Sequence, residues 1–382
     1  MVHSQNSPLH VIGLMSGTSA DGIDAALLQT DGRTVKSFGP TYHKAYPEVL
    51  KAAIHQAFGR PPNADTILLE KMVTEQHAEA VFALLKRANL TSEDVDLIGF
   101  HGQTLFHKPP QFRGDKGETH SIGDGYLLSS LTGLPVIDQF RLNDIAQGGQ
   151  GAPLVAIFHQ ALARDLDKPL AFLNIGGIAN VTWLGEKNSD ILAFDTGPGN
   201  ALMDDWVRNY CDIPWDEDGK IAAKGTVHED IVRKWLSYPY FSQTLPKSLD
   251  RQCFHSSLAD VAEIPFEDAL ATLTAFTAAT LQKALHFFPE EPKLWVISGG
   301  GAHNTTLIRM IREGVRGEVK RASELGLNGD ALEAQAFAFL AVRSLRKYPL
   351  TFPGTTGVAR PLTGGRLCTG ASIIDSQPFA VG

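Results

Sequence analysis

The chain has 382 residues, more than one hydrophobic core usually supports, so two domains are expected. Hydrophobic residues make up 43% and charged residues 20%, the formal net charge is -8, and no run of lysine or arginine stands out, so nucleic acid and anionic membranes are not expected partners. No apolar run is long enough to span a bilayer, residues 1–8 lack the pattern of a secretory signal, and the three cysteines fit no disulfide framework, which together predict a cytoplasmic protein.

Two similar hairpins open the two halves of the chain. A strand that starts at Val11 runs into a turn at Ser16, and a second strand returns over 22–28. Later, a strand at 169–175, a turn at Gly176 and Gly177, and a strand at 178–184 repeat the pattern. The repeat suggests a duplicated domain with a cleft between the copies, and two unrelated hairpins remain the alternative.

Strands and helices alternate along the rest of the chain. Helical spacing of apolar residues predicts helices over 64–88, near 266–285 and over roughly 331–346. Short buried strands are predicted at 95–100, ending at His101, and at 294–298. Residues 109–120 and 349–370 are rich in proline, glycine and polar residues and are predicted to be loops. This alternation indicates an α/β class with mainly parallel pairing inside each domain.

Glycine-rich turns follow three of the predicted strands, whereas no P-loop, Gly-x-Gly-x-x-Gly, His-Glu-x-x-His or Gly-x-Ser-x-Gly motif is present. Phosphate oxygens need several converging N–H donors, and glycine lets the main chain approach closely. Thr18 and Ser19 add hydroxyl donors to the first turn, and Asp21 could bind magnesium. The turns predict phosphate binding at Gly17, Thr18, Ser19, Ala20, Asp21, Gly22, Gly176, Gly177, Gly299, Gly300 and Gly301.

The sharpest carboxylate motif is Phe194-Asp195-Thr196-Gly197-Pro198-Gly199-Asn200. Asp195 stands at the end of a predicted buried strand, beside a turn that leads into a helix. This position suits a general base that faces a cleft. A carboxylate that caps the following helix is the equal alternative.

Read together, these segments resemble the anhydro-N-acetylmuramic acid kinase family. The matching stretches follow the family's order over nearly the whole chain: 13–24, 101–104, 148–154, 173–180, 194–200, 299–302 with Asn304, and Glu333-Ala334 with 336–338. The resemblance implies a two-lobed actin-like ATPase (ribonuclease H-like) fold of duplicated domains with ATP between the lobes. It implies an N-terminal lobe over 1–140 with the first phosphate hairpin, in which Ile23 and Asp24 also contact ATP, and a tail at about 347–382 that packs back on this lobe. The C-terminal lobe over 141–346 would hold the second phosphate hairpin, the catalytic Asp195 and, at 299–301, a turn on the nucleoside side.

The same resemblance implies the roles of single residues. Asp195 is expected to be the catalytic base, and Asp21 and Glu333 are candidates for holding Mg²⁺. His101, Gln103, Arg141 and Glu333 are expected to contact the sugar. Base-activated water would attack the anomeric carbon, and the released 6-oxygen would capture the γ-phosphoryl group of ATP. A homodimer is expected from the family alone.

Some of these residues have structural alternatives, and two segments depart from the family pattern. His101 could be a buried, satisfied loop histidine, and Arg141 could either meet the lactyl carboxylate or form a structural ion pair. Gln139 replaces an acid usual in the family, and Leu249-Asp250 replaces a Thr-Gly pair. Both segments lie where contacts to the sugar are expected. A kinase for another anhydrosugar such as levoglucosan, or a catalytically silent sugar sensor, remains open.

Overall fold

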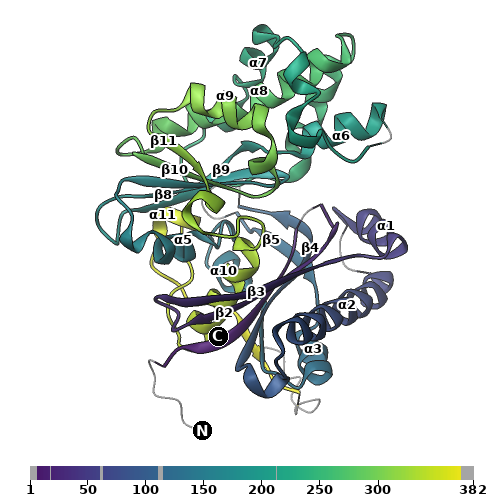
Figure 1. Ribbon diagram of the computed structural model, residues 1–382, viewed down its shortest axis with the longest axis vertical. Helices are drawn as coiled ribbons and strands as arrows, with labels where there is room; N and C mark the ends of the chain where they lie inside the picture. Colours follow the sequence, from purple (N-terminus) through teal and green to yellow (C-terminus); the bar gives the residue numbers. More distant parts are fainter. Residues whose placement is uncertain (1–6, 18, 61–62, 111–114, 212, 371–382) are drawn as a thin grey trace.

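The computed structural model describes residues 7–17, 19–60, 63–110, 115–211 and 213–370, and their fold is built on two mixed sheets (Figure 1). The first sheet has the order β12-β6-β4-β1-β2-β3, with β5 paired to β4, and the second has the order β11-β10-β7-β8-β9. The first contains β1 (Leu9–Ser16), β2 (Gly22–Thr30), β3 (Val35–Ala45), β4 (Leu97–Lys108), β5 (Glu118–Ile122), β6 (Val136–Asp138) and β12 (Arg366–Cys368). The second contains β7 (Leu170–Ile175), β8 (Ile178–Leu184), β9 (Ile191–Pro198), β10 (Leu294–Ser298) and β11 (Glu318–Arg321).

The two sheets repeat one topology. In the first, β1, β2 and β3 are antiparallel neighbours, and β4 and β6 continue the sheet in parallel on the other side of β1. In the second, β7, β8 and β9 are the antiparallel unit, and β10 and β11 continue in parallel on the other side of β7. This shared strand order confirms the duplication and the two-lobed actin-like, ribonuclease H-like fold.

Helices form a layer on the outer face of each sheet and a third layer between the sheets, and each of these layers packs on its own apolar core. The outer face of the first sheet is covered by α1 (Glu48–Ala57), α2 (Ala64–Ala88) and α3 (Gly125–Thr132). The outer face of the second packs against α6 (Ala201–Tyr210), α7 (Glu229–Trp235), α8 (Phe266–Ala284) and α9 (Thr305–Gly314). Between the sheets lie α5 (Ala156–Leu162) and α10 (Leu332–Leu345), and the short helices are α4 (Leu142–Ala146) and α11 (Pro353–Thr356) (Figure 1).

Helix α10 lies directly on the first sheet although its sequence belongs to the predicted second lobe. A Cβ at Gly13 of β1 would come within 1.8 Å of the Ala334 carbonyl oxygen, and one at Gly99 of β4 within 2.1 Å of the Phe337 oxygen. Only glycine permits this approach, which places the start of α10 beside the carboxyl end of β1. The division of the chain at residues 140 and 346 stays a prediction.

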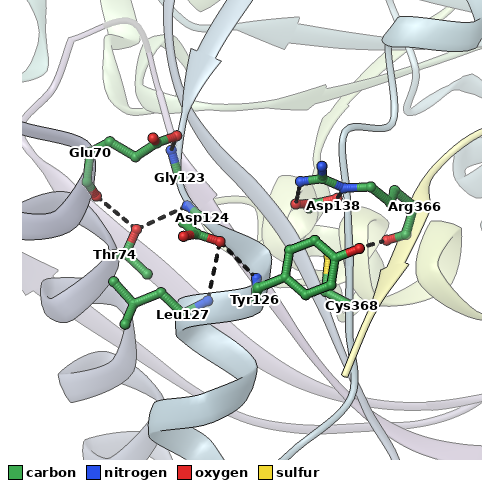
Figure 2. A network of polar contacts seen from close by, with 9 residues as sticks. All are labelled: Glu70, Thr74, Gly123, Asp124, Tyr126, Leu127, Asp138, Arg366 and Cys368. Atoms are coloured by element: carbon green, nitrogen blue, oxygen red, sulfur yellow. Dashed lines mark hydrogen bonds and ion pairs between the residues drawn. The ribbon is translucent and has the colours of Figure 1, made fainter. Parts of the chain in front are cut away.

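Strand β12 connects the C-terminal part of the chain to the first sheet. It pairs antiparallel with β6, where Arg366 Nε and Nη2 donate to the two carboxylate oxygens of buried Asp138 at 3.0 and 2.7 Å. The Arg366 guanidinium also lies over the Tyr126 ring, 5.1 Å from its centroid (Figure 2). Nearby, Asp124 caps α3 by accepting from the Tyr126 and Leu127 N–H groups (Figure 2).

The structure confirms most of the predicted elements and corrects the two predicted loops and the end of one strand. Helix α2 occupies its predicted range because Asn63 forms a capping box at its start and Asn89 ends it in the left-handed conformation. The predicted loops at 109–120 and 349–370 in fact contain parts of β5, α11 and β12. The strand predicted to end at residue 100 continues to Lys108, because Gly102, at φ 72°, lets it bend. Within the described residues no helix is long and apolar enough to cross a membrane.

Candidate active site

Gln103 of β4 hydrogen-bonds the turn between β1 and β2. Gln103 is fully buried, and its Nε2 donates to the Gly17 carbonyl at 3.0 Å while its Oε1 accepts from Ser16 Oγ at 2.6 Å. Ala20 closes the turn with φ 53° and an N–H bond to the Gly17 oxygen. Both ends of the Gln103 amide are thus used by the hairpin, so its predicted contact with the sugar stays a prediction. Thr18 lies outside the described residues.

The acidic residues around this hairpin have partners of their own. Asp21 lies 2.5 Å from Lys51 Nζ of α1, and Asp24 lies 2.7 Å from His43 Nδ1. Burial raises the pKa of Asp21, but hydrogen bonds from Lys51 and Ser19 outweigh it and hold the pKa below its ordinary value. The hydrogen bond to Asp24 raises the pKa of His43. Asp21 therefore carries a full negative charge beside Lys51 at neutral pH.

The second and third glycine turns abut each other at the ends of β7 and β10. A Cβ at Gly299, which has φ 76°, would come within 2.4 Å of Asn174 Oδ1, and one at Gly301 within 2.3 Å of the Ile175 side chain. The carbonyl oxygens of Gly176 and Gly177 accept from the N–H groups of Asn200 and Gly199, at 2.7 and 2.9 Å. These contacts fix the backbone that the sequence predicts to bind phosphate.

Asp195 lies on β9, and one of its two carboxylate oxygens is already bonded. Its side chain is buried, and Oδ2 accepts from the Leu249 N–H at 2.7 Å. Within the described residues no hydrogen bond reaches Oδ1. Burial raises the pKa of this carboxyl to about 7, against the lowering effects of the Leu249 N–H and of the charges on Arg141 and Lys247. A carboxyl with one free oxygen and a pKa near neutrality is suited to general-base catalysis.

Arg141 lies within electrostatic reach of Asp195, and two acceptors hold its guanidinium. Its Nη1 donates to the Gly151 carbonyl at 2.6 Å and its Nη2 to His101 Nε2 at 2.9 Å, while its buried Nε has no partner among the described residues. His101 Nδ1 is bonded to the Gly102 carbonyl, and burial lowers the His101 pKa to about 3. The neutral imidazole therefore orients the arginine, and both of its ring nitrogens are occupied.

The ion pair that was the alternative role for Arg141 is not found in the described part of the chain. Asp144 uses its two oxygens to accept from the Gly151 N–H at 2.7 Å and from Thr356 Oγ1 at 2.6 Å. Burial lowers the pKa of Arg141, while the charges of Glu333, Asp195 and Asp144 oppose that effect. Arg141 thus remains a cation with a free N–H donor, surrounded by acids at a distance.

Glu333 stands at the start of α10, between the first hairpin and Arg141. Its half-buried carboxylate makes no hydrogen bond or ion pair with a described residue. Burial and the Asp24 charge raise its pKa to about 7, against the lowering effect of Arg141. A carboxylate in this state would be stabilised by a cation. Nevertheless, nowhere in the described ranges are three His, Cys, Asp or Glu side chains grouped to hold a metal ion.

The structure thus brings Asp195, Arg141 and His101 together, and it places Glu333 within electrostatic reach of Arg141 and Asp24. The predicted magnesium candidates Asp21 and Glu333 differ in state, because Asp21 is paired with Lys51 and Glu333 is not.

The sequence does not predict the residues that hydrogen-bond Asp195. The Leu249 N–H binds its side chain, the Lys247 carbonyl accepts from its N–H at 3.3 Å, and the Tyr240 hydroxyl donates to its carbonyl at 2.5 Å. Buried Lys247 has its Nζ over the rings of Phe287 and Tyr240, and burial lowers its pKa to about 8. The departure from the family pattern at Leu249 affects a side chain in the core, whereas the contact to Asp195 is made by backbone.

Several solved structures align with most of this chain at low sequence identity. The activator of the 2-hydroxyisocaproyl-CoA dehydratase from Clostridium difficile with bound ADPNP aligns over 89% of this chain and 96% of that chain, with 14% identity and a TM-score of 0.45. A ROK family glucokinase from Streptomyces griseus in complex with glucose and AMPPNP aligns over 87% and 99%, with 15% identity and a TM-score of 0.39.

The sequence comparisons are far closer. The family model described as anhydro-N-acetylmuramic acid kinase matches residues 9–369. Relatives with this name include a Zymomonas mobilis protein, 45% identical over 93% of this chain and 98% of the relative, and a Methylobacterium nodulans protein, 47% identical over 94% and 99%. The chain belongs to the anhydro-N-acetylmuramic acid kinase family.

Proposed function

We propose that this chain is an ATP-dependent sugar kinase that opens the 1,6-anhydro ring of anhydro-N-acetylmuramic acid with water and phosphorylates the 6-oxygen. The product is N-acetylmuramic acid 6-phosphate, an intermediate expected in the recycling of cell-wall peptidoglycan. Family membership over residues 9–369 supports the activity. The observation that carries the chemistry is Asp195, a buried carboxyl with one oxygen fixed by the Leu249 N–H and the other free.

Asp195 supplies the base for the hydrolytic half of the reaction. Its free oxygen takes a proton from a water molecule, and that water attacks the anomeric carbon while the bond to the 6-oxygen breaks. The leaving oxygen forms a bond to the γ-phosphorus as the bridge to the β-phosphate breaks, so phosphoryl capture does the work of a general acid. The Leu249 N–H holds the carboxylate itself, while the Lys247 carbonyl and the Tyr240 hydroxyl fix the main chain of Asp195 during this step.

The phosphates of ATP are assigned to the glycine turns. The first hairpin over 17–24, with Lys51 nearby, and the turn at Gly176-Gly177 are assigned to the phosphates, although the Gly176 N–H already donates to the Ile178 carbonyl at 3.2 Å. The turn at 299–301 is assigned to the nucleoside side. Mg²⁺ would neutralise charge on the transferred group, and the unpaired carboxylate of Glu333 fits such a cation. Asp21 would have to leave Lys51 to serve as a second ligand. With few protein ligands, phosphate oxygens and water would complete the coordination.

Arg141 is the residue on which we base the choice of sugar. Its Nε–H is buried and unpartnered, and a buried arginine donor without an acceptor is costly. The lactyl carboxylate of a muramic acid would satisfy this donor and pair with the charge, whereas levoglucosan has no carboxylate. The homodimer, the cytoplasmic location and direct sugar contacts of His101 and Gln103 remain predictions.

A panel of sugars tests the proposed function. The protein is incubated with ATP and Mg²⁺ and with anhydro-N-acetylmuramic acid, anhydro-N-acetylglucosamine, levoglucosan or open-chain N-acetylmuramic acid, and the products are identified by mass spectrometry. A phosphorylated, water-opened product from the first sugar in clear preference to the others is expected. Preference for levoglucosan would reassign the substrate. Binding of the sugar without any phosphorylated product, in a sample that binds ATP, would identify a sugar sensor instead.

A further inference from the structure

A row of polar side chains crosses one face of the second sheet and ends at Asp195. Cross-strand register pairs Ser298 with Asn174, Asn174 with Asn180, and Asn180 with Asp195. Residues in register on neighbouring strands point to the same face, so these four side chains are neighbours. Their face is the one turned toward the first sheet, because residues of the same alternation, such as Leu184 and Ala193, belong to the core between the sheets.

Asn180 differs from the other asparagine in this row. Asn174 Oδ1 accepts from Ser298 Oγ at 3.5 Å, but Asn180 Oδ1 is buried and has no partner among the described residues. The pairing of β8 with β9 shifts register between Ala179 and Asn180, next to the point where Asn180 meets Asp195. Such irregularities re-aim side chains and occur frequently beside active sites. A buried acceptor left without a donor is destabilising, so a donor from a ligand or solvent molecule is expected there.

The water molecule that attacks the sugar in the proposed reaction needs such an acceptor. A water that attacks carbon through one lone pair keeps a single orientation only if both of its O–H groups are held. Asp195 Oδ1 holds the O–H that loses its proton, and the adjacent Asn180 Oδ1 is the available acceptor for the other. We propose that Asn180 is a catalytic residue that orients the attacking water by accepting its second hydrogen. This inference rests on the proposed function, since it assigns a role within the hydrolytic step.

A residue that orients the attacking water would affect water and methanol differently, whereas a residue that only packs would affect both nucleophiles alike. Methanol can replace water as the nucleophile, but it has one O–H, which Asp195 alone would hold. Its oxygen would bond to the anomeric carbon while its proton passes to Asp195. The 6-oxygen would still capture the γ-phosphoryl group and release ADP, which gives a methyl glycoside 6-phosphate. Loss of the Asn180 acceptor should therefore slow the attack of water more than the attack of methanol.

The test compares Asn180→Ala and Asn180→Leu with the unaltered protein in water that contains methanol. Mass spectrometry gives the ratio of methyl glycoside 6-phosphate to free sugar phosphate. In both variants we expect this ratio to rise about tenfold and kcat in plain water to fall about tenfold, the effect of one positioned hydrogen bond. KM for sugar and ATP should change less than about threefold, because the contact is to water and not to either substrate.

Three variants separate the loss of the hydrogen bond from a change in volume at the site and from a general effect of substitution in this sheet. Asn180→Leu fills the volume that Asn180→Ala opens, so a rise confined to the alanine variant would mean easier entry of methanol and would overturn the proposal. Asn180→Asp keeps an acceptor oxygen at this position and should keep the original ratio. Asn174→Ala, one strand further from Asp195, should leave the ratio unchanged.

The outcomes are distinguishable from one another. If kcat falls in the alanine and leucine variants while the ratio stays constant, or if neither variant forms the methyl glycoside, Asn180 does not orient the water. If kcat stays within twofold, the proposal is also wrong. If the unaltered protein forms no sugar phosphate at all, the proposed function itself has failed.

Discussion

Replacing Asp195 by asparagine should move turnover and stability in opposite directions. The folded-state pKa of Asp195 is raised from 3.8 to about 7, so the folded protein binds this proton more tightly than the unfolded chain. Between these two pH values stability decreases as pH rises, and above about pH 7 the full cost of the buried charge is present. This pKa shift corresponds to a loss of at most about 4 kcal/mol in the free energy of unfolding. Because the protein relaxes around the charge, we expect a loss of about half that value.

Asp195→Asn removes the charge but keeps the size and one acceptor for the Leu249 N–H. At pH 8 the variant should be about 2 kcal/mol more stable than the unaltered protein, and near pH 4 the two should be equal within about 0.5 kcal/mol. Turnover should fall ~10²–10⁴-fold, because the base is lost. In the unaltered protein, kcat/KM should also decline as the pH falls below about 7.

Denaturant unfolding of both proteins at pH 4 and pH 8 measures the stability difference, and ADP release with the anhydro sugar measures turnover. A melting shift with ATP and Mg²⁺ that is equal in both proteins shows that the variant is folded and binds nucleotide. A variant that is less stable at pH 8, or one that keeps more than about a tenth of the rate, would show that Asp195 is not a buried base with a raised pKa.

Three further substitutions test other parts of the site and fold. Arg141→Lys should raise KM for a carboxylate-bearing anhydrosugar about tenfold or more and leave levoglucosan binding unchanged; an equal effect on both sugars would remove the lactyl assignment. Gln103→Ala should raise KM for ATP about tenfold with little change in KM for the sugar, because the amide holds the first hairpin, and the reverse pattern would restore Gln103 to a sugar contact. Arg366→Met should lower the free energy of unfolding by about 1–3 kcal/mol, since Asp138 is left buried without its partner, whereas a neutral result by denaturant unfolding would mean that β12 is held by other contacts.

The sequence was most informative where a local pattern decides the structure. The spacing of apolar residues predicts α2 over its whole length, and glycine pairs predict the hairpin turns. Asp195 could be singled out because a carboxylate at the end of an apolar strand beside Gly-Pro-Gly is unusual. These features depend on neighbours in the chain and need no knowledge of the tertiary fold.

Features that depend on contacts between distant segments could not be predicted in this way. Helical periodicity predicts that α10 exists but not that it lies on the first sheet, where Glu333 comes near Arg141. The Leu249 N–H reaches Asp195 across 54 residues of sequence, and a backbone donor leaves no signal in side-chain identity. The hydrogen bonds of the Gln103 amide to the first hairpin likewise join residues that are far apart in the sequence, and the sugar contact expected of Gln103 stays a prediction.

Oxygen labelling tests the coupling of hydrolysis and phosphorylation most directly. The reaction is run with anhydro-N-acetylmuramic acid and ATP in ¹⁸O-labelled water, with quenching before the free anomeric hydroxyl exchanges with solvent. Fragmentation of the sugar phosphate locates the label. Water activated by Asp195 should place one ¹⁸O on the anomeric carbon and none in the ester linkage between the 6-oxygen and phosphorus. Label in the ester oxygen, or an anomeric oxygen without label, would contradict the mechanism and with it the role of Asp195.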